Sequence, residues 1–175
     1  MDTRISAYIG LGSNLDDPVA QIARAIASLE HLPASRLRAV SSCYRNPPLG
    51  PQDQPHYVNA VAALETTLAP RALLDALQAL ERAQGRVRTA ERWGPRTLDL
   101  DLLTYGDAII SEDGLKLPHP GIAARAFVLV PLAEIAPQLI IPGFASVATL
   151  LAGVDRASVV PVADPTSMPR LSHRR

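Results

Sequence analysis

The chain reads Leu98-Asp99-Leu100-Asp101-Leu102-Leu103, a run in which apolar and acidic side chains alternate. Alternation with a period of two is typical of a β-strand that presents leucines on one face and aspartates on the other. Carboxylates two residues apart on a strand lie side by side, roughly 7 Å apart between their Cα atoms. They repel each other unless a cation lies between them. The run therefore predicts a strand whose acidic face binds a cation.

The acidic strand indicates which cation to expect, and the arginines before it indicate which ligand. Mg²⁺ prefers oxygen ligands such as carboxylates, and arginine guanidinium groups suit phosphate oxygens. An isolated aspartate pair could instead mark the solvated face of an antiparallel sheet, but Trp93 and the nearby arginines argue against that alternative. Carboxylates that bind a metal, beside arginines that bind phosphate, indicate phosphoryl-type transfer. The four arginines are Arg86, Arg88, Arg92 and Arg96.

The surrounding pattern predicts the fold. Pro18 and Pro70 suit the first turn of two helices, and Asp16 or Asp17 would cap the first. The order strand, helix, strand, strand, helix, strand predicts an α+β, ferredoxin-like fold, a mainly antiparallel sheet with helices packed on it. We expect both helices on one face, which leaves the other face free for long loops and a site. Besides the acidic strand, the expected strands cover residues 5–11, 36–44 and 56–68.

Four further segments have a recognisable pattern: two turns, one long loop and one short helix. Gly10-Leu11-Gly12-Ser13-Asn14 lacks the third glycine of a dinucleotide fingerprint, and we interpret it as a tight strand-to-helix turn. Residues 46–55 contain too many prolines for regular structure and predict a long functional loop. Gly106-Asp107 predicts a hairpin-like turn into a following strand. A short helix is expected over residues 125–135, bent or divided by its internal proline.

Composition narrows the class of protein. The chain has 175 residues, a formal net charge of zero and a single cysteine, Cys43, which excludes an internal disulfide. We expect one domain over residues 1–160 and a loose tail over 161–175. The charge balance gives no reason to expect nucleic acid or a membrane as partner, and with 4% aromatic residues a base-stacking RNA-binding sheet is disfavoured. The lack of an apolar leader pattern predicts a cytoplasmic protein.

Several longer blocks resemble one family, the 6-hydroxymethyl-7,8-dihydropterin pyrophosphokinases of folate biosynthesis. The most specific block is Arg92-Trp93-Gly94-Pro95-Arg96-Thr97-Leu98-Asp99-Leu100-Asp101. The resemblance extends from about residue 5 to about residue 145 and implies a ferredoxin-like fold. It also implies transfer of pyrophosphate from ATP to the pterin hydroxymethyl group, giving AMP and the pterin diphosphate. The other blocks are residues 7–15, 41–55, 57–60, 86–88, 118–120 and 125–127.

The resemblance also implies roles for individual residues. Two Mg²⁺ ions would bind Asp99 and Asp101, and ATP would be the co-substrate. Members of the family are commonly monomeric, so a monomer is expected. The catalytic residues would be Arg86, Arg96, Asp99 and Asp101; the pterin would contact Asn46, Pro47, Leu49, Tyr57, Asn59 and Phe127; and ATP would contact Gln78, Glu81, Arg88, Trp93, Leu102, His119 and Arg125.

Two alternatives stay open at this level. Another two-metal nucleotidyl or phosphoryl transferase on a ferredoxin-like sheet would use the aspartate pair but not the pocket around Asn59. A non-catalytic module that binds a pterin or a nucleotide would use the pocket without turnover. The residues from Gly114 to Pro120 depart from some relatives, which leaves the adenine contacts undefined, and no general base is evident.

Overall fold

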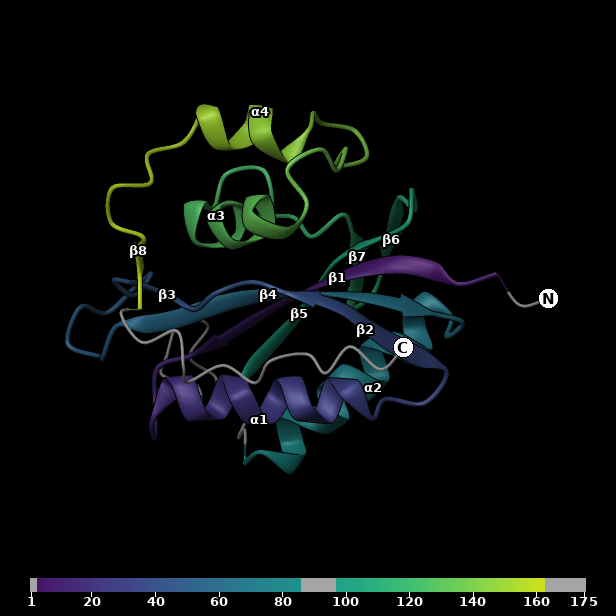
Figure 1. Ribbon diagram of the computed structural model, residues 1–175, viewed down its shortest axis with the longest axis horizontal. Helices are drawn as coiled ribbons and strands as arrows, with labels where there is room; N and C mark the ends of the chain where they lie inside the picture. The colour runs from purple at the N-terminus through teal and green to yellow at the C-terminus, as the bar shows by residue number, and fades with distance from the viewer. Residues whose placement is uncertain (1–2, 86–96, 163–175) are drawn as a thin grey trace.

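The computed structural model describes residues 3–85 and 97–162, which form one sheet of six strands with helices on both faces (Figure 1). A separate two-stranded hairpin stands beside it. The elements are β1 (Ile5–Ser13), α1 (Pro18–Glu30), β2 (Ser35–Val40), β3 (Tyr44–Asn46), β4 (Tyr57–Thr66), α2 (Pro70–Ala83), β5 (Asp99–Tyr105), β6 (Ile110–Glu112), β7 (Leu115–Leu117), α3 (Ala126–Ile135), α4 (Val147–Ala152) and β8 (Val160–Pro161).

The strand pairing confirms the predicted α+β, ferredoxin-like sheet. The strands lie in the order β5-β1-β4-β3-β8, β2 also pairs with β4, and every pairing is antiparallel. β1 and β4 therefore lie at the centre, flanked by the strand that follows each helix. This is the arrangement that two interleaved strand–helix–strand units produce.

Both predicted helices begin where their prolines indicated. The side chain of Asp17 caps α1 by accepting a hydrogen bond from the backbone N–H of Ala20, and Pro70 opens α2. Gly85 follows α2 with a φ of +89°, the left-handed conformation that suits glycine after a helix. Both helices cover one face of the sheet, below it in Figure 1. Their apolar stripes pack there against Ile9, Leu11 and neighbouring residues in the first core.

The prediction of one strand over residues 36–44 was wrong. The chain forms β2 and then β3, and both pair with β4. The register shifts between Leu37 and Ala39, and the backbone N–H of Ser41 bonds to Val61 O at 2.9 Å. A bulge and a break let one segment turn along β4 without losing its hydrogen bonds. A period-two pattern cannot show such a break, because the side chains on either side still alternate.

The sequence predicts that the opposite face of the sheet is free, and the structure shows that it is partly covered. α3 and α4 cover part of it, above the sheet in Figure 1. They enclose a second core that contains Val61, Leu103 and Leu129. The helix expected over residues 125–135 is confirmed, and it continues through Pro131. α4 has only six residues and a serine cap, too short for a periodic pattern to reveal.

The remaining strands form a separate hairpin, β6 and β7, and an added edge strand of the sheet, β8. Gly106-Asp107 makes the predicted turn, but β6 then pairs with β7 rather than returning to β5. β8 pairs with β3, and the N–H of Val162 bonds to Cys43 O. The boundary between domain and tail near residue 160 stays a prediction, because residues 163–175 lie outside the described part of the chain. Across the described ranges, no helix combines the length and the apolar character needed to cross a membrane.

Candidate active site

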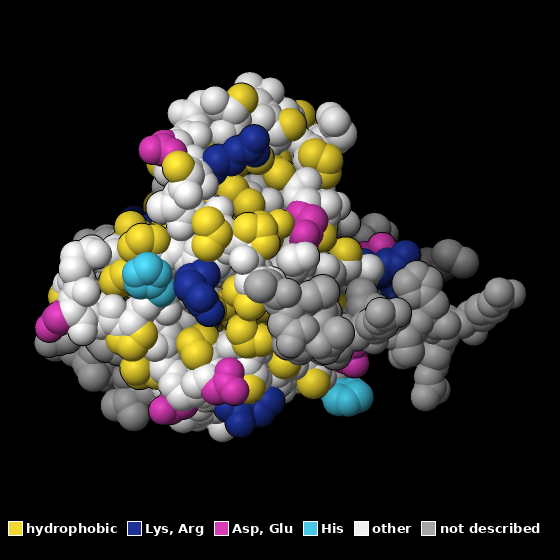
Figure 2. All heavy atoms as spheres, turned by 60° about the vertical axis from the view of Figure 1, so that its left-hand side comes forward, with side chains coloured by type: hydrophobic (Ala, Val, Ile, Leu, Met, Phe, Trp, Pro, Cys, Tyr) yellow, Lys and Arg dark blue, Asp and Glu magenta, His cyan; other side chains and the backbone are white. Residues whose placement is uncertain are grey.

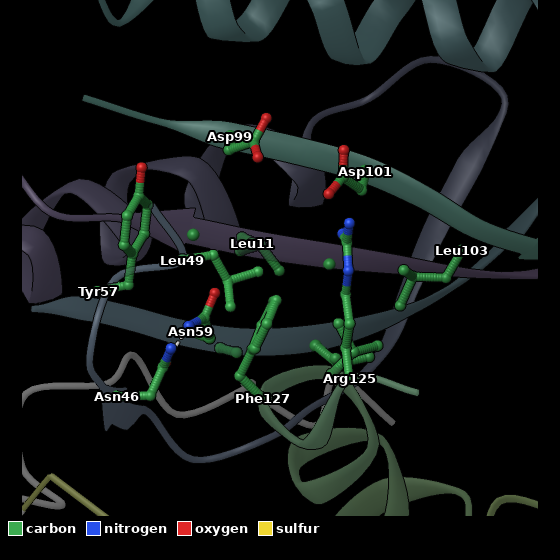
Figure 3. A pocket seen from close by; sticks show the side chains of 15 residues that line it. Leu11, Asn46, Leu49, Tyr57, Asn59, Asp99, Asp101, Leu103, Arg125 and Phe127 are labelled. Carbon is green, nitrogen blue, oxygen red and sulfur yellow. Dashed lines mark hydrogen bonds between the residues drawn. The ribbon is translucent and has the colours of Figure 1, made fainter. Parts of the chain in front are cut away.

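The floor of the candidate site is a row of paired residues on three adjacent strands. Gly12 of β1 lies opposite Asp99 of β5 on one side and opposite Asn59 of β4 on the other. Gly10 is likewise paired with Asp101. Residues directly opposite in an antiparallel pair share a face, so both aspartates and the asparagine point to the side of the sheet that carries α3. Figure 3 shows these side chains around one pocket.

The two glycines bring the strand backbone close to the pocket. A Cβ on Gly12 would lie 2.9 Å from Oδ1 of Asn59, whereas a Cβ on Gly10 would lie 3.4 Å from the Leu103 side chain. The interpretation of residues 10–14 as a turn was wrong for residues 10–13, because β1 continues through Ser13. Glycine at alternate positions of a strand signals close approach of another group, and this spacing matches that of the aspartates.

An amide and aromatic wall forms one side of the pocket. Asn59 Nδ2 donates to Oδ1 of Asn46, and Asn46 Nδ2 donates to Pro47 O at 3.0 Å. Asn46 is buried on β3, and Tyr57 at the start of β4 lies opposite it. Leu49 comes from the loop of residues 47–56 and is 43% exposed at the pocket. The predicted pterin residues thus lie together, except that Pro47 does not line the pocket surface.

The N-terminal end of α3 forms the other wall. The guanidinium Cζ of Arg125 lies 5.8 Å from the centre of the Phe127 ring, within the range of a cation–π contact. Figure 3 shows Arg125 extending toward Asp101 and the Phe127 ring standing between Arg125 and Asn59. The guanidinium packs on Gly121, where a Cβ would collide with it. A flat heterocycle between Phe127 and Tyr57 would have an aromatic side chain near each face.

His119 approaches the acidic strand from the segment after β7. Its Nε2 lies 3.9 Å from Oδ2 of Asp101, and its Nδ1 accepts a hydrogen bond from the N–H of Gly121 at 3.1 Å. Burial lowers the pKa of His119, the nearby Arg125 charge lowers it further, and Asp99 opposes them. The lowered pKa favours a neutral imidazole. Because Nδ1 accepts a hydrogen bond, the proton of this neutral ring is on Nε2. Such a group can donate a hydrogen bond to an oxygen without adding charge.

The acidic pair fits a hard divalent cation. Of the His, Cys, Asp and Glu residues in the described ranges, no three gather into a site that could hold a metal. Two carboxylates facing one pocket suit Mg²⁺ all the same, since this ion is usually held by one or two carboxylates together with substrate phosphates and water. The pocket is lined by residues of β1, β3, β4, β5 and α3, a breadth that suits a ligand larger than an ion.

Other residues predicted for ATP do not line this pocket. Glu81 is buried on α2 and accepts a hydrogen bond from the N–H of Leu100. Leu102 points to the face that carries α1 and α2, where it is part of the first core, and Gln78 lies on α2. β5 is an edge strand of the sheet, so a ligand would have to pass around its edge to touch both faces. Arg86, Arg88, Trp93 and Arg96 lie outside the described residues.

Several pocket residues were not singled out from the sequence. They share no polar signature, because they contribute backbone or apolar surface. Leu103 could have been found by extending the alternation that identified the aspartates, because it lines the pocket together with Asp99 and Asp101. The unpredicted lining residues are Gly10, Leu11, Gly12, Ala60, Val61, Leu103 and Val128.

Among the described residues, the outer surface near the loop of residues 47–56 shows no dominant charge. Figure 2 looks at the end of the molecule that carries this loop and β8. Acidic and basic side chains are interspersed there among apolar ones, in keeping with the zero net charge of the chain. Positive charge for an anionic ligand therefore has to come from residues placed locally, such as Arg125.

Comparison with known proteins agrees with this geometry. A family model described as 7,8-dihydro-6-hydroxymethylpterin-pyrophosphokinase (HPPK) matches residues 8–137. A protein of Pseudomonas aeruginosa named 2-amino-4-hydroxy-6-hydroxymethyldihydropteridine pyrophosphokinase is 56% identical over 145 residues, which cover 83% of this chain and 89% of that protein. A Haemophilus influenzae protein of the same name is 54% identical over 138 residues, 79% of this chain and 86% of its own.

Solved structures agree at the level of the fold. The crystal structure of wild-type Plasmodium falciparum HPPK-DHPS matches with a TM-score of 0.68 over 87% of this chain, at 11% sequence identity. The chain spans 45% of the length of that protein. At this identity the match establishes a shared architecture and says nothing about individual residues.

Proposed function

Because the chain belongs to the 7,8-dihydro-6-hydroxymethylpterin-pyrophosphokinase family, we propose that it transfers pyrophosphate from ATP to the hydroxymethyl group of 6-hydroxymethyl-7,8-dihydropterin. The products are AMP and the pterin diphosphate, an intermediate of folate biosynthesis. The observation that carries the proposal is a single pocket that contains both the acidic pair of β5 and the amide and aromatic wall. One set of groups suits phosphate and its metal, and the other suits a flat heterocycle.

In this proposal the pterin lies between Tyr57 and Phe127. The Asn59 amide lies at the edge of the heterocycle, where it can donate and accept hydrogen bonds. Its geometry is prepared in advance, because Asn59 bonds to Asn46 and its Oδ1 lies against Gly12. A preorganised amide loses less freedom on binding than a mobile one. Leu49, from the loop of residues 47–56, covers the pterin on the open side.

The phosphate half of the site lies along β5. Asp99 and Asp101 would hold two Mg²⁺ ions together with the phosphate oxygens of ATP. When bound, Mg²⁺ offsets phosphate charge and lowers the pKa of the attacking hydroxyl. Arg125 and a neutral His119 reach the same region and can contact phosphate oxygens. Arg86, Arg88, Trp93 and Arg96 are proposed to complete this half, together with Gln78, Glu81 and Leu102 at the nucleotide.

The chemistry then requires alignment more than proton transfer. The pterin hydroxyl oxygen attacks the β-phosphorus and loses its proton to solvent. The bond from that phosphorus to the bridging oxygen of the α-phosphate breaks, and AMP leaves with that oxygen. Phosphoryl-type transfer depends mainly on positioning and on stabilisation of charge. Holding acceptor and donor in one pocket meets both needs. The monomeric state, the cytoplasmic location and the absence of a nucleic acid partner stay predictions.

The test is AMP formation from ATP and Mg²⁺, measured with and without 6-hydroxymethyl-7,8-dihydropterin. We expect AMP only with the pterin, and a loss of roughly 100-fold or more in Asp99→Asn and Asp101→Asn, since even groups that merely support metal ligands contribute 10- to 100-fold. Asp107→Asn, at an exposed turn after the same strand, is the matched control and should retain activity. Release of ADP or pyrophosphate instead of AMP would contradict the proposal.

A further inference from the structure

We propose that Glu134, which lies outside the pocket, is a positioning residue that sets the pterin wall by tying α3 to β3. The inference rests on the proposed function, because it concerns how the same pocket is held in shape. Glu134 is the last residue but one of α3 and is exposed. Neither the sequence patterns nor the pocket lining points to it.

The Glu134 carboxylate accepts three hydrogen bonds from one short segment. Oε2 accepts from the backbone N–H of Ser42, and Oε1 accepts from the Ser42 hydroxyl at 2.7 Å and the Tyr44 hydroxyl at 3.1 Å. Ser42 lies in the break between β2 and β3, and Tyr44 is the first residue of β3. The carboxylate thus bonds to a segment where the strand pairing is interrupted.

The same break is fixed to the sheet from its other side. The Ser41 hydroxyl accepts from the N–H of Val61 at 2.9 Å, and the N–H of Ser41 donates to Val61 O at 2.9 Å. Consecutive residues of the break are therefore held by β4 and by α3. Val61 itself lines the pocket. Any shift of the break against α3 would change the distance between the two walls of the pocket.

The geometry of α3 links Glu134 to the aromatic wall. Glu134 lies seven positions after Phe127, and in an α-helix that spacing places two side chains on nearly the same face. One end of this face supplies the Phe127 ring to the pocket, and the other end bonds to Ser42 and Tyr44. Fixing the far end restrains both rotation of the helix about its axis and sliding along β3.

The geometry of β3 links the same contact to the amide wall. Tyr44 and Asn46 are two residues apart on β3 and share a face, and Tyr44 lies opposite Asn59. The Tyr44 hydroxyl bonds to Glu134, and Asn46 bonds to Asn59. Glu134 therefore connects the strand that carries one pterin wall to the helix that carries the other.

The acidic half of the site lies away from this connection. Asp99 and Asp101 belong to β5, and both β1 and β4 separate that strand from β3. Loss of the Glu134 contacts should consequently alter the binding of the pterin, whose two walls belong to β3 and α3, more than the binding of ATP, which depends on α3 only through Arg125. A residue that merely stabilised the fold would affect both substrates alike.

The experiment compares Glu134→Ala and Glu134→Gln by steady-state kinetics of AMP formation. We expect the KM for the pterin to rise about tenfold in the alanine variant, within the range for lost charge-assisted hydrogen bonds. The glutamine variant should rise less, because its amide oxygen still accepts. The KM for ATP should stay within about twofold of the wild type in both variants, as expected for a site that keeps its own contacts.

Two further variants keep the test independent of folding defects at Glu134. Tyr44→Phe keeps the ring and removes one donor, so it should raise the pterin KM less than Glu134→Ala, and the double variant should be less than additive. Glu112→Ala removes an exposed carboxylate on β6 and should leave both KM values unchanged. An unchanged pterin KM in Glu134→Ala and Tyr44→Phe, or equal rises for both substrates, would overturn the proposal.

Direct titration with the pterin separates this inference from the proposed function. If the wild type binds the pterin but forms no AMP, the proposed reaction fails, while the Kd values of the same variants still decide the role of Glu134. If Glu134→Ala then binds the pterin as tightly as the wild type, the inference is overturned. If the wild type does not bind the pterin, both proposals fall.

Discussion

Gly12 determines how closely the Asn59 amide approaches β1. A Cβ at this position would lie 2.9 Å from Asn59 Oδ1, closer than the van der Waals contact distance. The asparagine would have to move, and its bond to Asn46 would be strained. The identity of residue 12 is thus linked to the geometry of the pterin edge, although glycine has no functional group.

We therefore expect Gly12→Ala to raise the KM for the pterin about tenfold, equivalent to about 1.4 kcal/mol. Gly10→Ala is the matched control within the same pocket, because the atoms nearest its Cβ belong to the flexible Leu103 side chain, the first at 3.4 Å, and its effect should be under about threefold. Steady-state kinetics with the pterin as varied substrate checks both. Equal effects of the two substitutions would show that the Asn59 contact is not what matters.

Cys43 gives a residue-scale prediction about pH. Burial, and then the Glu134 carboxylate, raise the pKa of its thiol to about 11. In the unfolded chain the thiol ionises near its usual value of about 8.5. The folded state holds the proton more tightly, so the stabilisation is complete below the unfolded pKa and is lost as pH rises toward the folded one.

Stability should consequently fall between about pH 9 and about pH 11, with a slope of up to about 1.4 kcal/mol per pH unit from this group. Urea unfolding at several pH values measures the slope. Cys43→Ala should show a shallower slope, while the part due to Tyr44, whose pKa is raised to about 12 by burial and by Glu134, should persist. Identical slopes in wild type and variant would contradict the assignment to Cys43.

At the scale of elements, the loop of residues 47–56 is held by a buried contact with the end of β1. Asn14 Nδ2 donates to Gln54 Oε1 at 3.1 Å and to Pro55 O at 3.0 Å. Asn14 is 1% exposed and Gln54 is 8% exposed. Buried amide hydrogen bonds of this kind are expensive to leave unmade. The loop that carries Leu49 is therefore fixed at the end nearer β4.

Asn14→Ala should lower the free energy of unfolding by about 1–3 kcal/mol, the usual penalty for leaving a buried polar group without its partner. It should also increase amide hydrogen exchange in residues 47–56 relative to the sheet. Ser28→Ala, which removes an exposed hydroxyl on α1, should change stability by less than about 0.5 kcal/mol. Faster exchange throughout the protein, rather than in the loop, would refute a local role.

For the whole molecule, the sheet divides two apolar cores with different consequences for the site. The first core packs α1 and α2 on one face, and the second packs α3 and α4 on the other. Leu77 is fully buried in the first and Leu129 in the second. The pocket lies on the side of the second core, so its aromatic wall depends on how α3 packs.

Leu77→Ala and Leu129→Ala should each destabilise the protein by about 2–5 kcal/mol, as cavity-forming substitutions do. Only Leu129→Ala should also weaken pterin binding at a temperature where both variants are folded, because the cavity loosens α3 under Phe127. Urea unfolding and pterin titration provide the two readouts. Weaker binding in Leu77→Ala to the same degree would show that the two cores do not act separately.

The sequence by itself determined those features that depend on local periodicity and local chemistry. The alternation around Asp99 places both carboxylates on one face, since the side-chain period of a strand is two. Pro18 and Pro70 marked helix starts because their fixed φ suits a first turn. The order of the elements then predicted the sheet topology, and the same residues predicted much of the proposed site through the resemblance.

Only the tertiary structure decided what meets across the sheet. The break after β2, the cover of α3 and α4, and the contact of Glu134 with Ser42 and Tyr44 join residues far apart in the chain. Local pattern carries no information about such pairs, because their contact depends on how packed elements are placed relative to one another. The role of Gly12 belongs to the same class, since a glycine acquires meaning only from the Asn59 amide that occupies the space beside it.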